Sequence, residues 1–225
     1  MKYFFPKMFL ILTGFVFSLS AQSWMFEDGN QGLDIQGIHY TDNDEEAIGG
    51  SLAYTWNSRI DIRISYLHSD FTFENRALQG QRFIPRIDWY IIKYSNELPL
   101  YFAVFGLYHQ ESFSPVQLNE EFRLSGNGWA AGFRASTHIF HGQKLILMPI
   151  LEYRYESMSR SAQRTPADQD YPAVKNHAFD FLVKMGREFV YGLSVYMEPG
   201  VKLSDGPPGF HIKLGFLLPL EGESD

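Results

Sequence analysis

The segment "AIGGSLAYTWNSRIDIRISYLHSD", residues 47–70, changes character at every second residue. In its first half the large apolar side chains share even-numbered positions: Ile48, Leu52, Tyr54 and Trp56. After Asn57-Ser58 the alternation resumes, with isoleucines at 60, 62 and 64 opposite the charged Asp61 and Arg63. A period of two predicts β-strands with one apolar face. The opposite face carries charges, and charged side chains are rarely buried in the core of a soluble protein. This face therefore needs an environment other than an ordinary hydrophobic core.

The same alternation continues through ten segments, most of them about 9 to 15 residues long. They cover residues 33–41, 46–57, 59–70, 83–95, 98–110, 127–140, 143–157, 174–186, 188–201 and 209–220. Strands that cross a membrane need about 9 to 11 tilted residues, whereas strands of soluble sheets are usually about 5 or 6 residues long. The segment lengths therefore favour a membrane barrel.

The connections between the segments alternate between short and long. Short links such as "NS" and "HGQ" follow the second and sixth segments, whereas "TFENRALQGQR" and "SFSPVQLNEEFRLSG" follow the third and fifth. Barrels of the bacterial outer membrane have short periplasmic turns and longer extracellular loops. The sequence thus predicts an all-β, antiparallel transmembrane β-barrel of about ten strands, with eight as the second choice.

The N-terminus has the pattern of a secretory signal. Lys2 and Lys7 precede the apolar run "MFLILTGFVF", and small residues follow as far as Ala21. We expect cleavage near Ala21, so that residues 1–21 are a signal peptide and residues 22–225 form the barrel domain. The chain has no cysteine, so it must fold without disulfides, and its formal net charge of -7 argues against nucleic acid as a partner.

Together these features resemble the small outer-membrane β-barrel proteins of Gram-negative bacteria. The final segment "GFHIKLGFLLPL", residues 209–220, resembles their C-terminal assembly signal, although a tail "EGESD" follows where a terminal aromatic residue is usual. The resemblance covers about residues 30–220 and is one of class. It implies localisation in the outer membrane of a Gram-negative bacterium, contact with outer-membrane lipid and lipopolysaccharide, and insertion by the barrel assembly machinery.

One face of the strands carries charges of both signs, which we expect to line the inside of the barrel. These predicted lumen residues are Asp61, Arg63, Arg86, Asp88, Arg134, Glu152, Arg154, Asp180, Lys184, Lys202 and Lys213. Opposite charges often lie two residues apart, as in Asp61 with Arg63. The pattern predicts either an interior filled by salt bridges and hydrogen bonds or a narrow, charge-lined, porin-like pore.

The opposite face carries aromatic residues toward the strand ends. We expect two interfacial girdles, because aromatic rings with a polar tip settle at membrane–water interfaces. The predicted girdle residues are Trp56, Tyr66, Tyr108, Trp129, Tyr153, Tyr155, Phe189 and Tyr191.

Three prolines and one glycine conflict with uninterrupted strands. Pro85, Pro149 and Pro199 lie within predicted strands, where each lacks the N–H group that a ladder needs. We expect bulges or strand ends at these prolines. A further bulge near Gly37 would keep the alternation of the first segment in phase.

The leading functional prediction is a structural or narrow pore-forming protein without enzymatic activity. Its long loops, about residues 111–126 and 158–173, are the expected contact sites for partners that the sequence does not identify.

Two other interpretations stay open. An outer-membrane protease or lipid hydrolase would use "HSD" (residues 68–70) and "HQES" (residues 109–112), which place His, Asp, Glu and Ser at the extracellular rim. A secreted soluble barrel would instead bind a ligand in its cavity. Neither the loop "DNDEE" (residues 42–46) nor the dispersed histidines form a full set of metal ligands, so we expect no metal and no cofactor.

Overall fold

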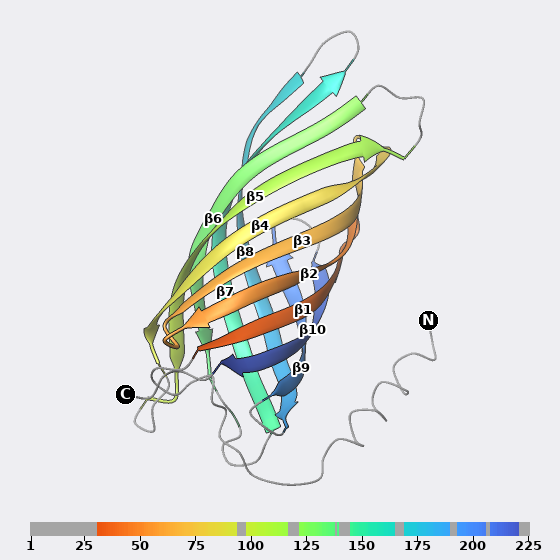
Figure 1. The fold of residues 1–225 in the computed structure, drawn as a ribbon. Helices are drawn as coiled ribbons and strands as arrows, with labels where there is room; N and C mark the ends of the chain where they lie inside the picture. The colour runs from red at the N-terminus through yellow and green to blue at the C-terminus, as the bar shows by residue number, and fades with distance from the viewer. Residues whose placement is uncertain are drawn as a thin grey trace.

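The computed structural model describes residues 31–93, 98–116, 122–137, 139, 145–164, 169–189, 193–205 and 208–220. Within them, ten strands form one closed barrel in which neighbours in sequence are neighbours in space (Figure 1). The strands are β1 (Gln31–Thr41), β2 (Glu45–Trp56), β3 (Ile60–Phe73), β4 (Arg76–Ile92), β5 (Tyr101–Pro115), β6 (Phe122–Ser136), β7 (Leu145–Arg164), β8 (Gln169–Glu188), β9 (Ser194–Ser204) and β10 (Gly209–Leu220). This confirms the predicted fold class and the count of ten. The predicted signal peptide lies outside the described residues.

Closure is made by the antiparallel pairing of β1 with β10. Their ladder runs from Gln31 opposite Leu220 to Thr41 opposite Phe210. Because every strand has a partner on both sides, the closed part of the barrel has no free edge, and nearly all of its backbone groups can pair within the sheet. Beyond the closed part, residues 169–177 of β8 pair with β7 and not with β9. Among the described residues, no helix is long and apolar enough to cross a membrane.

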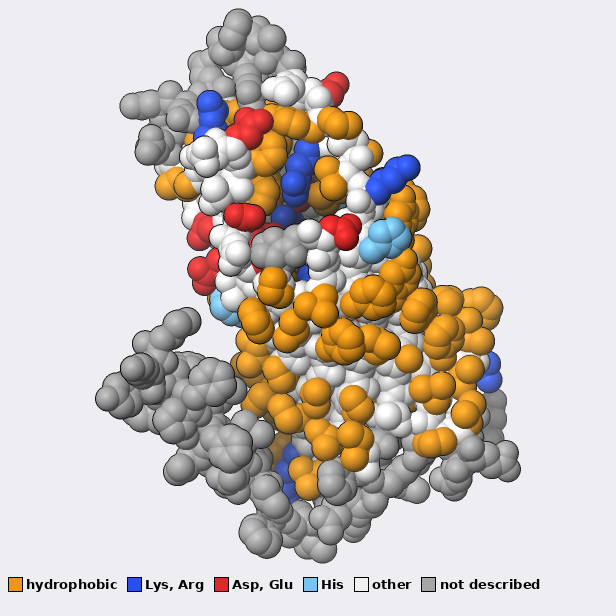
Figure 2. Space-filling model, turned by 180° about the vertical axis from the view of Figure 1, so that it is seen from behind, with side chains coloured by type: hydrophobic (Ala, Val, Ile, Leu, Met, Phe, Trp, Pro, Cys, Tyr) orange, Lys and Arg blue, Asp and Glu red, His pale blue; other side chains and the backbone are white. Residues whose placement is uncertain are grey.

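Large apolar side chains cover the outer face of the barrel. The exposed fraction is between 48 and 62 % at Ile48, Ile62, Ile64, Ile87, Leu214 and Phe216. Figure 2 shows hydrophobic side chains gathered in a band over the lower part of one face, with charged and polar side chains above it. An apolar surface of this kind marks contact with lipid or another apolar partner, which does not suit a soluble barrel.

Several strands continue well beyond this band. β7 and β8 have 20 residues each, whereas β1 and β9 have 11 each. We call the long ends of β3 to β8 the extension, which comprises residues 71–82, 108–116, 122–128, 157–164 and 169–175. In Figure 1 the ends of β5 to β8 rise above the rest of the barrel.

In the extension the polarity of the two faces of the sheet is reversed. Its inner face carries a fully apolar cluster of Leu78, Phe113, Phe122, Leu124 and Ala162, against which Phe71, Phe73 and Tyr171 pack. Its outer face is polar, with exposed side chains at Ser112, Ser114 and Arg123. The extension thus has a small hydrophobic core of its own, as expected for a sheet that lies in water.

The predicted loops were too long, because the structure continues the strands into them. The stretch "TFENRALQGQR" forms the end of a hairpin whose two-residue turn is Glu74-Asn75, with φ angles of 50° and 62°. Asn57-Ser58 at the other end of β3 has the same left-handed conformation, with φ angles of 52° and 49°. Two successive positive φ angles are typical of the type I′ turn, whose twist matches that of paired strands. Most of residues 111–126 and 158–173 is likewise strand.

The expectations for Gly37 and for the prolines were wrong. β1 keeps one register with both neighbours, so Ile38 faces the interior without a bulge. Pro85 and Pro199 lie inside β4 and β9, where one ladder is interrupted for two residues and then resumes in the same register. Pro149 lies inside β7 opposite Val183. A proline removes only its own donor, so the neighbouring pairs can hold the register.

The register shifts occur elsewhere, between Tyr90 and Ile92 and between Met158 and Arg160.

We predict that Phe113→Ala loosens the extension without opening the barrel. Phe113 is fully buried in the apolar cluster, and a Phe→Ala change in a core costs about 3 to 5 kcal/mol. Hydrogen exchange measured by mass spectrometry should speed up in residues 108–116 and 122–128 and stay slow in β1 and β10. Ser114→Ala, a change at the next and exposed position, serves as the control. Unchanged exchange in the extension of Phe113→Ala would contradict the existence of this core.

Candidate functional site

An ion-pair network occupies the centre of the barrel. Arg86 of β4 binds Asp88 on its own strand (Nη2–Oδ1 2.6 Å) and Glu152 of β7 (Nη1–Oε1 2.9 Å). Arg134 of β6 binds the same Glu152 carboxylate, at 2.8 Å. The Arg86 guanidinium also lies 3.8 Å from the ring centroid of Phe105. Glu152 therefore links three strands through the interior, and charge-assisted bonds of this kind are among the stronger hydrogen bonds in proteins.

A second network joins strands on both sides of the β1–β10 seam, where the barrel closes. The Tyr196 hydroxyl donates to Asp34 (2.5 Å), and Arg63 of β3 binds the same carboxylate (3.2 Å). Glu198 of β9 accepts from Lys213 of β10 at 2.6 Å. These contacts connect β1, β3, β9 and β10 across the seam where the barrel closes.

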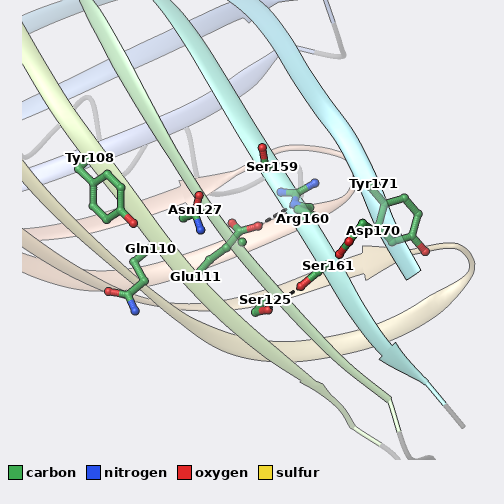
Figure 3. A pocket seen from close by; sticks show the side chains of 11 residues that line it. Tyr108, Gln110, Glu111, Ser125, Asn127, Ser159, Arg160, Ser161, Asp170 and Tyr171 are labelled. Carbon is green, nitrogen blue, oxygen red and sulfur yellow. Dashed lines mark hydrogen bonds and ion pairs between the residues drawn. The ribbon is translucent and has the colours of Figure 1, made fainter. Parts of the chain in front are cut away.

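A third cluster lies where the charged lumen meets the extension. Arg82 of β4 pairs with Glu45 and with Glu111, the latter at 3.2 Å. Glu111 also binds Arg160 of β7, at 2.6 Å, as drawn in Figure 3. The Arg160 guanidinium lies 5.0 Å from the ring centroid of Phe71, which packs against the apolar cluster of the extension. This cluster is the boundary between the ionic and the apolar interior.

The structure places all eleven predicted lumen residues on the inner side of the sheet, where they are buried or line interior cavities. It brings Arg86, Asp88, Arg134, Glu152, Arg154 and Asp180 into one connected set of ion pairs. Asp61 lies apart from it and accepts a hydrogen bond from Tyr90 at 3.1 Å.

Several inward-facing charged residues were absent from the predicted set, among them Asp34, Glu45, Arg82, Glu111, Glu156, Arg160 and Glu198. Arg82, Glu111 and Arg160 lie just beyond the predicted strand ends, on the inward parity. Extending the alternation by one or two steps would have found them.

Two cavities lie in the interior that the described residues enclose. The cavity toward the extension has a volume of ≈ 340 Å³, and the one toward the chain termini has a volume of ≈ 30 Å³.

 Four side chains line both cavities: Gln36, Arg63, Arg134 and Lys213. They form the constriction between the two cavities, because no other described residue lines both.

The structure does not assemble the predicted rim hydrolase site. His68 and Asp70 point outward from β3 and are exposed, and Asp70 accepts a hydrogen bond from Gln79 (3.1 Å). His109 and Glu111 point into the barrel from β5. The two histidines therefore lie on opposite faces of the sheet and cannot share a substrate. Among the described residues, no group of three His, Asp or Glu side chains is placed to hold a metal ion.

The described residues of the predicted girdles lie on the outer face. Trp56, Tyr66, Tyr108, Trp129 and Phe189 are between 38 and 54 % exposed. Tyr155 packs against Trp129 with ring centroids 5.6 Å apart, and Tyr153 hydrogen-bonds His177 at 2.7 Å. Tyr191 lies outside the described residues. Trp89, 55 % exposed beside the turn end of β3, is a further outward aromatic residue that the prediction omitted.

Comparison with known proteins finds no matching family model and no matching curated protein. The structure is similar to the translocator domain of the autotransporter NalP from Neisseria meningitidis, with a TM-score of 0.50 and 9 % identity over 95 % of this chain and 93 % of that chain. The chain has the fold of an outer-membrane β-barrel.

Two further solved structures are similar over most of their length. The outer-membrane protease OmpT from Escherichia coli has a TM-score of 0.39 and 10 % identity, over 85 % of this chain and 94 % of that chain. Ail, the attachment invasion locus protein of Yersinia pestis, has a TM-score of 0.38 and 8 % identity, over 86 % of this chain and 100 % of that chain. The likeness to all three lies in the fold alone.

We predict that Glu152→Gln strongly destabilises the barrel. The change leaves the guanidinium groups of Arg86 and Arg134 buried without their shared carboxylate, and breaking a buried pair in this way costs about 3 to 5 kcal/mol. Urea unfolding of the refolded protein in lipid vesicles, followed by tryptophan fluorescence, measures the loss. The control is Glu46→Gln, because Glu46 is exposed and pairs with His39 at the surface. A surface pair of this kind contributes about 0 to 1 kcal/mol. Equal midpoints for the two variants would contradict the central role of Glu152.

Proposed function

We propose that this chain is a closed outer-membrane barrel that acts through the part of its sheet outside the membrane, without enzymatic activity. The observation that carries the proposal is the ion-pair network across the lumen. Glu152 is 3 % exposed and Asp88 is 1 % exposed, so both carboxylates are enclosed by their partners. A solute could pass only by separating these pairs, which would leave buried charges unpaired at a cost of several kcal/mol.

The extension supports a role in contact with other molecules. Its apolar cluster holds the long strand ends together on the inner face. The polar outer face is therefore available for contact with other molecules. Binding residues tend to be presented by a rigid scaffold, and here the scaffold is a continuous sheet. We assign partner contact to the outer face of the extension and to the connections at its tip.

The proposal includes export and localisation. Residues 1–21 would direct secretion and be removed, and the assembly machinery would insert residues 22–225 into the outer membrane of a Gram-negative bacterium. Support comes from the outward face of β10, where apolar side chains recur at every second position from Phe210 to Leu220. The apolar band and the aromatic girdles would contact lipid and lipopolysaccharide.

A narrow channel is the second candidate, and the two interior cavities favour it. Only the side chains of Gln36, Arg63, Arg134 and Lys213 line both cavities in the described part of the chain. Rearrangement of these side chains would join the two cavities into one path.

Conductance of the refolded chain in a planar bilayer separates the two candidates. We predict that the wild-type protein gives no stable current steps, whereas Arg63→Ala with Arg134→Ala opens a small conductance, because the double change removes two side chains of the constriction. Heat-modifiable migration on a gel verifies folding in both cases. Stable steps from the wild-type protein, with an ion selectivity that Arg63→Ala alters, would overturn the closed barrel in favour of the channel.

A further inference from the structure

A groove crosses the outer face of the extension. It has a volume of ≈ 370 Å³ and runs over β5, β6, β7 and β8 (Figure 3). The side chains that line it from the outer face include Tyr108, Gln110, Ser125, Asn127, Ser161 and Asp170. Sites for small molecules commonly occupy about 300 to 1,000 Å³, so the groove is large enough for one.

Small side chains make the floor of the groove. Ser125 of β6 lies opposite Ser161 of β7, and their hydroxyl oxygens are 3.2 Å apart. Larger side chains stand on both sides of this floor: Tyr108 and Gln110 on β5, and Asp170 on β8. The register shift after Met158 lies within the same stretch of β7. The hollow thus follows from side-chain size on neighbouring strands.

The chemistry of the groove is polar but almost uncharged. Glu111 and Arg160 bind each other on the inner side of the sheet, beneath the floor. Of the lining side chains on the outer face, Asp170 alone carries a charge. The others offer hydroxyl and amide groups that both donate and accept hydrogen bonds. Such a surface suits neither an acyl chain, which needs apolar walls, nor a phosphate group, which needs cations.

We infer that this groove binds a saccharide. Sugar hydroxyls donate and accept hydrogen bonds as Ser, Asn and Gln side chains do, and the C–H face of a sugar ring packs on an aromatic ring. Tyr108 offers such a ring at the edge of the groove, where it is 45 % exposed and lies opposite Trp129 on β6. The amphipathic character of tyrosine fits a position between apolar and wet surroundings.

The position of the groove identifies two sources for the saccharide. Tyr108 and Trp129 belong to the predicted girdle, so the groove begins where the apolar outer face ends. The headgroup of a membrane glycolipid would reach this height from the bilayer, and a free glycan would reach it from solution. The inference rests on the proposed role of the extension in surface contact, and it does not require the lumen to be closed.

Binding to the full-length mature chain in phosphatidylcholine vesicles tests the inference, with tryptophan fluorescence as readout. In one arm, core oligosaccharide freed from lipid A is titrated. In the other arm, the vesicles contain either lipopolysaccharide with its core sugars or lipopolysaccharide that lacks most of them. We expect saturable binding in at least one arm. Binding of free oligosaccharide identifies a soluble glycan as sufficient, whereas a response only to sugar-bearing vesicles identifies the glycolipid headgroup.

Two variants and one control connect the signal to the groove. Tyr108→Ala and Asn127→Ala should each weaken binding about tenfold, because each removes a sugar contact worth roughly 1.4 kcal/mol. Ser114→Ala lies on the same outer face of β5 outside the groove and should bind like the wild type. All three changes are at exposed positions, and heat-modifiable migration verifies folding. Absence of binding in both arms, or equal binding by Tyr108→Ala, Asn127→Ala and Ser114→Ala, overturns the inference. Neither result bears on the conductance of the barrel.

Discussion

The structure depends on one constraint: in hydrocarbon, every backbone N–H and C=O group must be paired within the sheet. The β1–β10 ladder meets it by closing the barrel, and closure turns half of the side chains of every strand inward. In a barrel about as wide as its side chains these residues must fill the space themselves. Charged residues can do so because opposite charges meet across it, as Arg86 and Arg134 meet at Glu152.

The polarity of the outer and inner faces therefore differs between the part of the sheet inside the membrane and the part beyond it. Inside the apolar band, lipid makes the outward residues apolar and leaves the lumen to ions. Beyond the band, water replaces lipid, and the apolar cluster around Phe113 and Leu124 moves to the inside. Arg82, Glu111 and Arg160 lie where the ionic interior meets the apolar interior. Both arginines pair with the Glu111 carboxylate, and each guanidinium group lies near an aromatic ring.

The sequence was sufficient to predict the barrel, because a period of two over long segments is a local signal. It predicted the inner position of Glu152 and the outer position of Trp129 for the same reason. It did not predict the extension, because the inner face there is apolar and the outer face polar, so the alternation looks as though it stops. Phe113 and Leu124 lie on the inner face, which carries charged residues in the middle of the barrel. The partners within the lumen, such as Tyr196 with Asp34, depend on closure and are not readable from local sequence.

The tight turn at Glu74-Asn75 and the long strands around it give the extension a property that flexible loops lack. A ligand that binds there finds side chains already held by the sheet, so little conformational entropy is lost on binding. The backbone pairing and the inner cluster do not depend on which side chains face outward. Divergent relatives could therefore change specificity by substituting every second residue of these strands, and the trace of such adaptation would be variation with a period of two.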